Sequence, residues 1–505
     1  MPLRTAGTPS ALFGTAVLGS ALISPAVLGV PPRPAAAPPR PRIAAVGGAG
    51  AAAVTITNGT RFIGAGGKVV HAHAGGMIKV GGHYYWFGQN AHSTNRFRFI
   101  SVYRSADLRT WRFRNHVLTQ ASADELNVAG LWRPKVIYNA RTRRYVLWMR
   151  KEKKEGDFRQ GRVAVATSAT VDGDYTYRGS FRPLGVKSFD MSVFRDDDGR
   201  AYLISTTNDQ KDLTIFRLTS DYRRPAARVA TLRGVGREAA SMFKRDGVYF
   251  IVSSGVTGWQ PNQAKYTSAR RITGPWSRHS NIGDSIAYGS QAASVLPVQG
   301  STTTSYLYMG DRNANAWGGR INGSEYVWLP LRFPSRRSVS MRWYPRVSIN
   351  TATGVVRGVG SGHAYEVLRA RHSGKCLAVR WSSKADGAGT AQQPCGTSAS
   401  SNQHWQALGL GNGYHRLVAR HSHKCLTVPS SSTADGVRVT QRTCGTGAAQ
   451  QWRLTRIDGY YRITARHSGK CLDIRHGSTA AGVRAIQYRC RGSANQQWRR
   501  AGAPY

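Results

Sequence analysis

Three nearly identical words in the last third of the chain constrain its fold most. Each reads Arg-His-Ser-x-Lys-Cys-Leu, at residues 371–377, 420–426 and 466–472. A second cysteine follows each first one at the same interval (376 to 395, 425 to 444, 471 to 490), and these are all six cysteines of the chain. Six cysteines can pair in fifteen ways, but the repeat favours pairing within each unit. The repeat predicts a domain of three equivalent, disulfide-braced lobes.

Each of the three units closes with Gln-x-Trp, at 403–405, 450–452 and 496–498. With these words, the region 364–500 resembles the ricin B-type β-trefoil lectins, also called carbohydrate-binding module family 13. The resemblance implies a sugar-binding domain. We expect the three tryptophans to lie in its core rather than against a ligand, because three lobes need an apolar centre on their common axis.

The resemblance also implies where sugar binds. In that family a carboxylate accepts hydrogen bonds from sugar hydroxyls, and an aromatic face meets the apolar face of the ring. The third lobe keeps the four side chains concerned: Asp473, Tyr488, Asn495 and Gln496. The other lobes replace the carboxylate and the aromatic, with Ala378 and Gln393 in lobe one and Thr427 and Arg442 in lobe two. One departure in lobe three is Ile486, beside Gln487, where the family has glutamine. We therefore expect one sugar site, in lobe three.

Upstream of the trefoil region, a strand-like segment recurs five times around a tyrosine. The shared residues are Tyr84, Tyr145, Tyr202, Tyr249 and Tyr306. The surrounding segments alternate as strands do and show no long helical periodicity. An all-strand repeat of about 50–60 residues is typical of propeller blades. We predict an all-β protein, a five-bladed β-propeller over 58–360 followed by a β-trefoil; a β-sandwich with accidental repetition is the alternative.

In a propeller the innermost strand of each blade lines the central channel, and the tyrosine strand would be the next one out. Residues eleven to fifteen positions before each tyrosine should then face the funnel: His73, Trp132, Arg133, Asp190, Glu238 and Gln291. Two carboxylates on neighbouring blades that face one pocket suit the hydrolysis of a glycosidic bond. Trp259 and Trp317 are candidate platforms for a sugar, with core packing as the alternative.

The words around these positions resemble glycoside hydrolase family 43, and within it the exo-β-1,3-galactanase-like branch. They are His71–Gly76, Arg133–Asn139, Asp190–Gly199, Gly236–Phe243, Ser254–Trp259 and Gly289–Gln291. The resemblance implies an inverting hydrolase for galactose-containing polysaccharide, above all the β-1,3-galactan of arabinogalactan. It implies that Glu238 protonates the leaving oxygen, that Asp190 orients Glu238 and tunes its pKa, and that Gln291 holds the attacking water. His73, Trp132, Arg133 and Trp259 are the expected substrate contacts.

Two departures from the family pattern leave alternatives open. The wider family has a catalytic-base aspartate on the first blade, where this chain offers His71 and His73; His73 is a rival to Gln291 as base. The galactanase-like branch has a glutamate where this chain has Trp132, and Glu125 is the acidic residue that could replace it. Another family 43 specificity, such as arabinofuranosidase or xylosidase, and a catalytically inactive glycan-binding protein are the alternative functions.

The N-terminal segment predicts export. Residues 11–30 are apolar and uncharged after a basic start, and small residues follow, so we expect a signal peptide over 1–37 and a Pro/Ala/Gly-rich linker over 38–57. A membrane anchor is the alternative reading of the apolar run. Paired cysteines agree with export. The expected location is extracellular.

The chain is strongly basic, with 71 Lys and Arg against 25 Asp and Glu and a formal net charge of +46. The basic residues are spread along the whole chain and form no stripe, so we interpret them as a solvated surface and expect no nucleic-acid partner. The expected partner is a polysaccharide, and the expected state is a monomer. No cofactor is expected, and no acidic cluster points to the channel calcium that family 43 propellers often carry.

Overall fold

The computed structural model describes residues 52–92, 96–154, 157–317, 319–360, 365–397, 400–411 and 413–503. The predicted signal peptide and most of the predicted linker lie outside these residues. No helix in the described ranges is long and apolar enough to cross a membrane. The helical elements are turns of three or four residues: η1 (Gln120–Ser122), η2 (Asp124–Leu126), η3 (Pro183–Gly185), η4 (Ala287–Gly289), η5 (Ala314–Trp317), η6 (Ile321–Gly323), η7 (Arg380–Ser382), η8 (Ser401–Gln403), η9 (Pro429–Ser431), η10 (Ala448–Gln450), η11 (Arg475–Gly477) and η12 (Ala494–Gln496).

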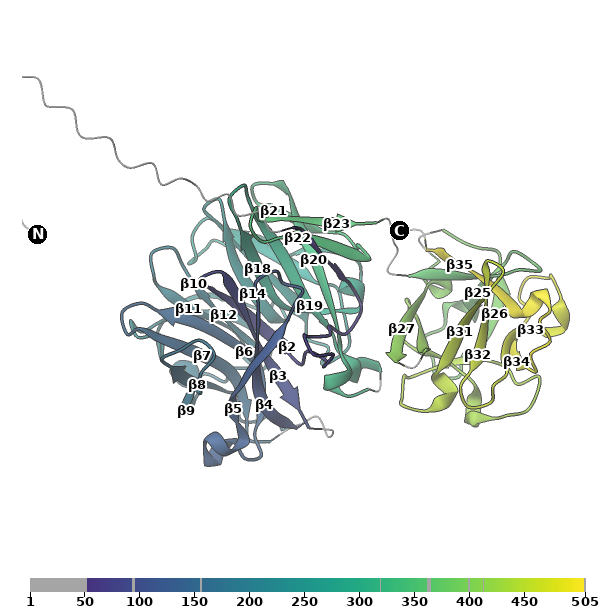
Figure 1. The fold of residues 1–505 in the computed structure, drawn as a ribbon, viewed down its shortest axis with the longest axis horizontal. Helices are drawn as coiled ribbons and strands as arrows, with labels where there is room; N and C mark the ends of the chain where they lie inside the picture. Colours follow the sequence, from purple (N-terminus) through teal and green to yellow (C-terminus); the bar gives the residue numbers. More distant parts are fainter. Residues whose placement is uncertain are drawn as a thin grey trace, which may run out of the picture. The chain divides into compact units, whose positions relative to one another are not determined.

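Five antiparallel sheets of four strands each follow one another along the chain (Figure 1). The first two contain β2 (His73–Val80), β3 (His83–Ala91), β4 (Phe97–Ser105) and β5 (Arg112–Thr119), then β6 (Gly130–Asn139), β7 (Arg144–Glu152), β8 (Arg162–Ser168) and β9 (Thr176–Phe181). The third contains β10 (Met191–Arg195), β11 (Ala201–Thr207), β12 (Asp212–Leu218) and β13 (Pro225–Leu232). The last two contain β14 (Arg237–Arg245), β15 (Val248–Gly255), β16 (Lys265–Ala269) and β17 (Ser280–Asn281), then β18 (Gln291–Gln299), β19 (Thr304–Arg312), β20 (Glu325–Ser335) and β21 (Ser338–Met341).

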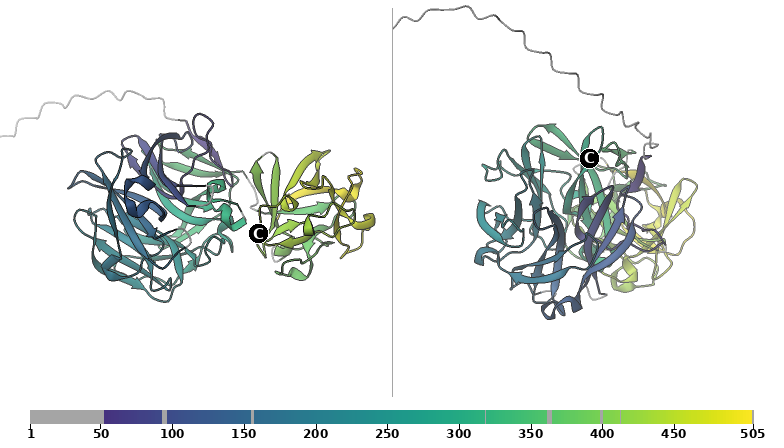
Figure 2. Two further views of the ribbon diagram at one scale, coloured as in Figure 1. Left: turned by 90° about the horizontal axis from the view of Figure 1, so that it is seen from below. Right: turned by 60° about the vertical axis from the view of Figure 1, so that its left-hand side comes forward.

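The first strands of these five sheets contact one another in a closed cycle, β2 to β6, β10, β14, β18 and back to β2. The other strands of each sheet follow that strand in chain order, as in a β-propeller. Figure 2 shows the ribbon from two further sides. All five recurrent tyrosines lie on the second strand of their sheet, where the sequence placed them. The all-β prediction is confirmed.

A sixth sheet precedes the trefoil and was not predicted. It has three strands, β1 (Val54–Thr57), β22 (Arg346–Asn350) and β23 (Val355–Val359), in the order β1-β22-β23. The described residues upstream of the trefoil therefore form six sheets where the repeat predicted five units. The tyrosine repeat could not predict this sheet. The three strands come from the two ends of the propeller region, and they contain none of the repeated words. In addition, β1 lies within the stretch 38–57 predicted as linker.

Four of the inner strands carry a β-bulge near their start. The register shifts lie between His73 and Gly76 on β2, Trp132 and Lys135 on β6, Glu238 and Ser241 on β14, and Ala292 and Ser294 on β18. Three residues within these bulges have positive φ angles: Ala74 (51°), Arg133 (57°) and Ala239 (53°). A bulge re-aims the neighbouring side chains. A β-bulge therefore recurs on four inner strands, at or beside the site residues that were predicted from the sequence.

The C-terminal region forms one twelve-stranded sheet with β-trefoil character, drawn in green to yellow in Figure 1. Its strands are β24 (Glu366–Ala370), β25 (Cys376–Val379), β26 (Thr390–Gln393), β27 (Trp405–Gly411), β28 (Tyr414–Ala419), β29 (Cys425–Thr427), β30 (Thr440–Arg442), β31 (Trp452–Ile457), β32 (Tyr460–Ala465), β33 (Cys471–Ile474), β34 (Ala485–Tyr488) and β35 (Gln497–Gly502). The disulfides Cys376–Cys395, Cys425–Cys444 and Cys471–Cys490 are formed, as predicted.

The three repeated tryptophans form the centre of the trefoil. Trp405, Trp452 and Trp498 are buried in one hydrophobic core. Their indole N–H groups donate to the carbonyls of Leu377, Leu426 and Leu472 at 2.9, 2.9 and 3.0 Å. Each ring is therefore fixed by the strand of its own lobe that begins with the first cysteine (β25, β29 or β33), and the prediction that these rings are core is confirmed.

Candidate active site

A cavity of about 300 Å³ opens where the inner strands of the propeller begin; we call it the funnel cavity. Six of the residues singled out from the sequence line it: Trp132, Arg133, Asp190, Glu238, Trp259 and Gln291. They come from β6, the residue before β10, β14, the loop after β15, and β18. Four different sheets therefore contribute to one site.

Arg133 joins two of the other site elements through three hydrogen bonds. Its Nε donates to Oδ2 of Asp190 at 2.6 Å, and its Nη2 donates to Oε1 of Gln291 at 2.6 Å. Its Nη1 donates to the carbonyl of Ala292 at 2.9 Å. The bulge on β6 places Arg133 at positive φ and turns its side chain across the funnel. One guanidinium thus fixes a carboxylate on the third sheet and an amide on the fifth.

Asp190 is held in its charged form. It is 7% exposed and receives a second ion pair, from Arg150 Nη1 to its Oδ1 at 3.0 Å. Burial alone would raise the pKa of Asp190, but the charges and hydrogen bonds of Arg133 and Arg150 outweigh burial and lower that pKa. Both oxygens of Asp190 are occupied by arginines, so this carboxylate is a fixed negative charge.

Glu238 has the opposite electrostatic environment. It is 5% exposed, and its Oε1 accepts a hydrogen bond from Nε2 of Gln291 at 3.0 Å. Burial and the negative charge of Asp190 raise the pKa of Glu238 to about 8, against the lowering effect of Arg133 and Arg150. Two carboxyl groups whose environments push their pKa values apart suit an acid and a permanently ionised neighbour. Glu238 can therefore carry a proton at neutral pH.

Trp132 belongs to an aromatic wall of the cavity. The guanidinium of Arg150 lies 5.2 Å from the Trp132 ring centre and 5.1 Å from that of Phe158, and the two rings are 6.0 Å apart. The family glutamate is thus replaced by a ring that stacks with an arginine. Glu125 does not replace it: its carboxylate pairs with Lys151 at 3.1 Å, and it does not line the cavity.

His71, which precedes β2, and His73, the first residue of β2, do not line the cavity. His73 is 1% exposed, and its ring stacks on Tyr326 with centres 5.5 Å apart. Burial, with the neighbouring His71, lowers the pKa of His73 to about 3, so this imidazole is neutral. Ala74, the next residue, lines the cavity instead. The side chain of Trp317 lies outside the described part of the chain.

Five polar or aromatic residues of the cavity were missed from the sequence: Arg150, Phe158, Gln210, Asp311 and Asn313. Two of them carry a positional signal. Arg150 and Asp311 each stand five residues after a recurrent tyrosine (145 to 150, 306 to 311) and pair across the sheet with Trp132 and Gln291. The second strand therefore supplies cavity-lining side chains beside the inner strand.

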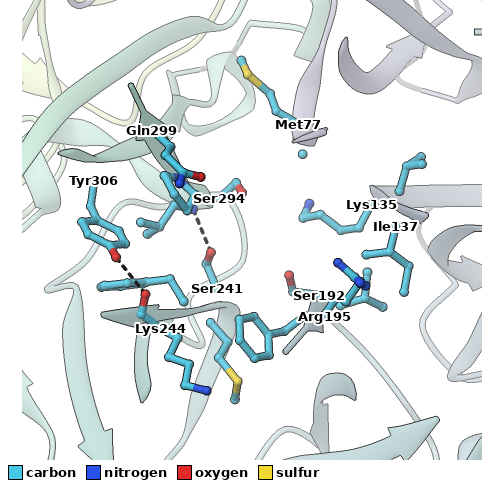
Figure 3. A pocket seen from close by; sticks show the side chains of 18 of the residues that line it. Met77, Lys135, Ile137, Ser192, Arg195, Ser241, Lys244, Ser294, Gln299 and Tyr306 are labelled. Atoms are coloured by element: carbon cyan, nitrogen blue, oxygen red, sulfur yellow. Dashed lines mark hydrogen bonds between the residues drawn. The ribbon is translucent and has the colours of Figure 1, made fainter. Parts of the chain in front are cut away.

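A second cavity, of about 480 Å³, lies further along the same inner strands. Figure 3 shows Lys135, Ser192, Ser241 and Ser294 around this hollow. Nζ of Lys135 donates to the carbonyls of Ala74 and Gly75 at 2.7 and 3.1 Å. Burial lowers the pKa of Lys135 well below its usual range. Lys135 thus supports the β2 bulge, whose residue Ala74 faces the funnel cavity.

The predicted sugar site of the third lobe is assembled around Asp473. Nδ2 of Asn495 donates to Oδ1 of Asp473 at 3.0 Å, and Nε2 of Gln496 donates to Oδ2 at 2.8 Å. Burial raises the pKa of Asp473. Tyr488 is half-buried, with Arg491 5.2 Å from its ring centre. All four residues therefore lie at the ends of β33 and β34 and in η12.

The glutamine expected in this lobe is Gln487 rather than Ile486. Its amide donates to the carbonyls of Ser432 and Ala434 at 2.6 and 2.8 Å. Gln441 in lobe two makes the same pair of bonds to the preceding loop, with Ser383 and Ala385. This glutamine thus braces neighbouring lobes.

No group of three or more His, Cys, Asp or Glu side chains in the described ranges is placed to hold a metal ion.

Two protein-family models match the chain. Residues 72–294 match the glycosyl hydrolases family 43. Residues 355–442, 401–488 and 448–504 match the ricin-type beta-trefoil lectin domain-like family. The first match covers β2, β6, β10, β14 and the start of β18, and the second covers the three lobes.

The chain is also similar to solved structures of known activity. It is 42% identical to an exo-β-1,3-galactanase from Clostridium thermocellum, with a TM-score of 0.60, over 88% of this chain and 99% of that one. An exo-β-1,3-galactanase from Phanerochaete chrysosporium, solved with galactose, is 25% identical, with a TM-score of 0.59, over 89% of this chain and 93% of that one.

A curated relative, xylosidase/arabinosidase 43B from Humicola insolens, is 22% identical over 224 residues, which are 40% of this chain and 39% of that protein. The chain thus spans well under half the length of this relative. The galactanase from Clostridium thermocellum is matched over nearly its whole length.

Proposed function

This chain belongs to the glycosyl hydrolases family 43, and on that premise we propose that it is an inverting exo-β-1,3-galactanase with an appended lectin domain. A glycoside hydrolase with a polysaccharide substrate agrees with both of its domains. The observation that carries the galactanase assignment is the 42% identity to a solved exo-β-1,3-galactanase across almost the whole of that protein.

The funnel cavity supports the proposal chemically. Glu238 acts as the general acid: it carries a proton at neutral pH and delivers it to the glycosidic oxygen as that bond breaks. Asp190 keeps this proton in place through its fixed charge, and Gln291 orients the acid through a 3.0 Å hydrogen bond. Trp132 and Trp259 offer rings against which a sugar can stack.

The trefoil supports action on a polymer. Asp473, Tyr488, Asn495 and Gln496 bind a sugar of the substrate and hold the catalytic domain near its chain ends. We further propose that residues 1–37 are a leader for export, that the hydrolase domain spans 58–360 and the lectin 364–500, and that arabinogalactan is the natural source of substrate. The three disulfides agree with an oxidising, extracellular location.

A substrate panel tests this function. The purified protein is incubated with de-arabinosylated β-1,3-galactan, arabinan and xylan, and the released sugars are separated by chromatography. Release of galactose from galactan alone is the expected result. Release of xylose or arabinose instead would move the assignment to the specificity that the Humicola insolens relative carries in its name, and no release from any substrate would favour a binding protein.

A further inference from the structure

One tryptophan of the lectin domain lies in water. Among the tryptophans whose side chains the structure describes, Trp381 alone is exposed, with 83% of its surface accessible. It lies in η7, the turn that follows β25 in lobe one. A single exposed apolar side chain is ordinary on a protein surface. What lies beside the ring in its lobe therefore decides whether it has a role.

Trp381 stands at the border of the position where its lobe would hold a sugar. In lobe three the same place in the turn is taken by His476, and the two residues share a left-handed backbone, with φ angles of 55° and 60°. That turn of lobe three, η11, runs beside the sugar site: a Cβ atom added to Gly477 would lie 3.9 Å from Cγ of Asn495. In lobe one, η7 likewise contacts η8, which carries Asn402. A sugar held by Asn402 therefore reaches the ring of Trp381.

Asn402 is anchored in the same way as its counterpart in lobe three. Its Nδ2 donates to the carbonyl of Val379 at 2.8 Å, and Nδ2 of Asn495 donates to the equivalent carbonyl of lobe three at 3.0 Å. Nδ2 of Asn495 also donates to Asp473, whereas lobe one has Ala378 at that position. The oxygen and the second N–H of the Asn402 amide have no hydrogen-bond partner among the described residues. They are therefore free to bond to a sugar hydroxyl.

The ring of Trp381 is itself held by a neighbour. The guanidinium of Arg380 lies 4.3 Å from the ring centre. One face of the ring thus meets a cation, and the high exposure of Trp381 shows that the opposite face is open to solvent. An open aromatic face packs against the apolar face of a pyranose, and a guanidinium beside it can donate to the hydroxyls.

Lobe two lacks both of these features. It has Ser430 in the place of Trp381 and Ala449 in the place of Asn402. It also lacks the carboxylate and the aromatic side chain of the site in lobe three. An exposed ring beside a free amide therefore occurs in lobe one and not in lobe two.

We propose that Trp381 and Asn402 form a second sugar-binding site, in lobe one, which takes a galactose unit of the polymer that lobe three binds. Stacking on Trp381 replaces the contact that the Asp473 carboxylate makes in lobe three, and Asn402 and Arg380 orient the sugar by hydrogen bonds. Two sites on one domain raise its affinity for a polymer far more than its affinity for a single sugar, because the second contact is intramolecular. The identity of the sugar rests on the proposed function.

The test measures co-sedimentation with insoluble de-arabinosylated β-1,3-galactan. The parent is the full chain carrying Glu238→Gln, so that the polymer is not consumed. Trp381→Ala should weaken binding about tenfold, and Trp381→Phe, which keeps a ring, should retain most of the binding. Phe113→Ala is the matched control. Phe113 is also an exposed aromatic, at 50%, but it lies on β5 of the propeller, so its removal should leave binding unchanged.

A second measurement separates the two lobes. The binding that remains in Tyr488→Ala should depend on Trp381, so the double variant Tyr488→Ala with Trp381→Ala should lose it. A soluble β-1,3-galactooligosaccharide should shift the tryptophan emission of Tyr488→Ala to shorter wavelength, because the sugar covers an exposed ring. The emission of the double variant should shift less, by the contribution of Trp381.

Two results would overturn the inference: Trp381→Ala binding galactan within twofold of its parent, or a double variant that binds as well as Tyr488→Ala. A parent that is dimeric by light scattering and becomes monomeric with Trp381→Ala would also overturn it, because the ring would then be a contact between two copies. If the parent does not bind galactan, the proposed substrate fails and the same variants are compared on xylan and arabinan. Equal binding of the parent and Trp381→Ala to those polymers, or no binding, would reject the site.

Discussion

At the scale of single residues, the account depends on two buried carboxyl groups with opposite environments. The sequence predicted both Asp190 and Glu238 by counting back from recurrent tyrosines, because chain register in a propeller is regular. It could not predict the arginine contacts that separate their pKa values, since Arg150 lies on a different strand from Arg133. Nor did it find Asp311, which the same register would have indicated five residues after Tyr306.

The pH profile should report the raised pKa of Glu238. A general acid works while it is protonated, so activity persists below that pKa of about 8 and is lost as pH rises through it. Asp190→Asn removes one cause of the rise and leaves Arg133 and Arg150, whose charges lower the pKa. We expect the alkaline limb of kcat/KM to move to lower pH by about one unit.

Asp196→Asn is the matched control for that shift. Asp196 directly follows β10, as Asp190 directly precedes it, is 5% exposed and pairs with Lys244 at 2.7 Å, but it does not line the funnel cavity. Its replacement should lower the melting temperature and leave the alkaline limb in place. If the alkaline limb of the Asp190→Asn profile stays at the wild-type pH, Asp190 does not raise the pKa of Glu238 and the role given to that carboxylate is contradicted.

At the scale of elements, the site is built by bulged inner strands. The sequence predicted which segments line the channel, because strand alternation and the tyrosine spacing survive in all five sheets. It did not predict the bulges, since they depend on how one strand meets its neighbour. It also missed the sheet of β1, β22 and β23, which joins segments nearly 300 residues apart (54 to 346). The strand propensity of a short stretch of sequence carries no information on which distant segments pair.

The bulge of β2 requires a residue without a side chain at Gly75. A Cβ atom added there would lie 1.8 Å from the carbonyl oxygen of Phe87 on β3. Gly75→Ala should therefore lower the free energy of unfolding by about 1–3 kcal/mol, and it should lower kcat because Ala74 faces the cavity. The turn residue Gly82 has open space around its Cβ position, so Gly82→Ala should change stability by less than about 0.5 kcal/mol. Urea unfolding of both variants measures the difference, and equal midpoints would contradict this account of the bulge.

At the scale of the whole molecule, catalysis and binding are assigned to separate domains. The sequence predicted the trefoil closely, because three copies of one word fix the lobes, the disulfides and the central tryptophans together. The choice among lobes rests on Asp473, which only the third lobe carries. Its hydrogen bonds to Asn495 and Gln496 are consistent with that choice.

Tyr488→Ala should separate the two activities. Removing the ring should weaken binding to galactan and raise KM for the polymer by roughly tenfold or more, while hydrolysis of an aryl galactoside stays unchanged. Arg442, at the same position of lobe two, is exposed, and Arg442→Ala should change neither value. Binding is measured by co-sedimentation with insoluble galactan. Equal losses in the two variants would show that the third lobe is not the binding site.

The central claim is that Glu238 drives an inverting hydrolysis of β-1,3-galactan. The most direct measurement follows the first minutes of reaction on de-arabinosylated β-1,3-galactan by proton NMR, with wild type beside Glu238→Gln. The account predicts that galactose appears first as the α-anomer with the wild type and does not appear with the variant. Galactose released first as the β-anomer, or at the same rate by both proteins, would contradict it.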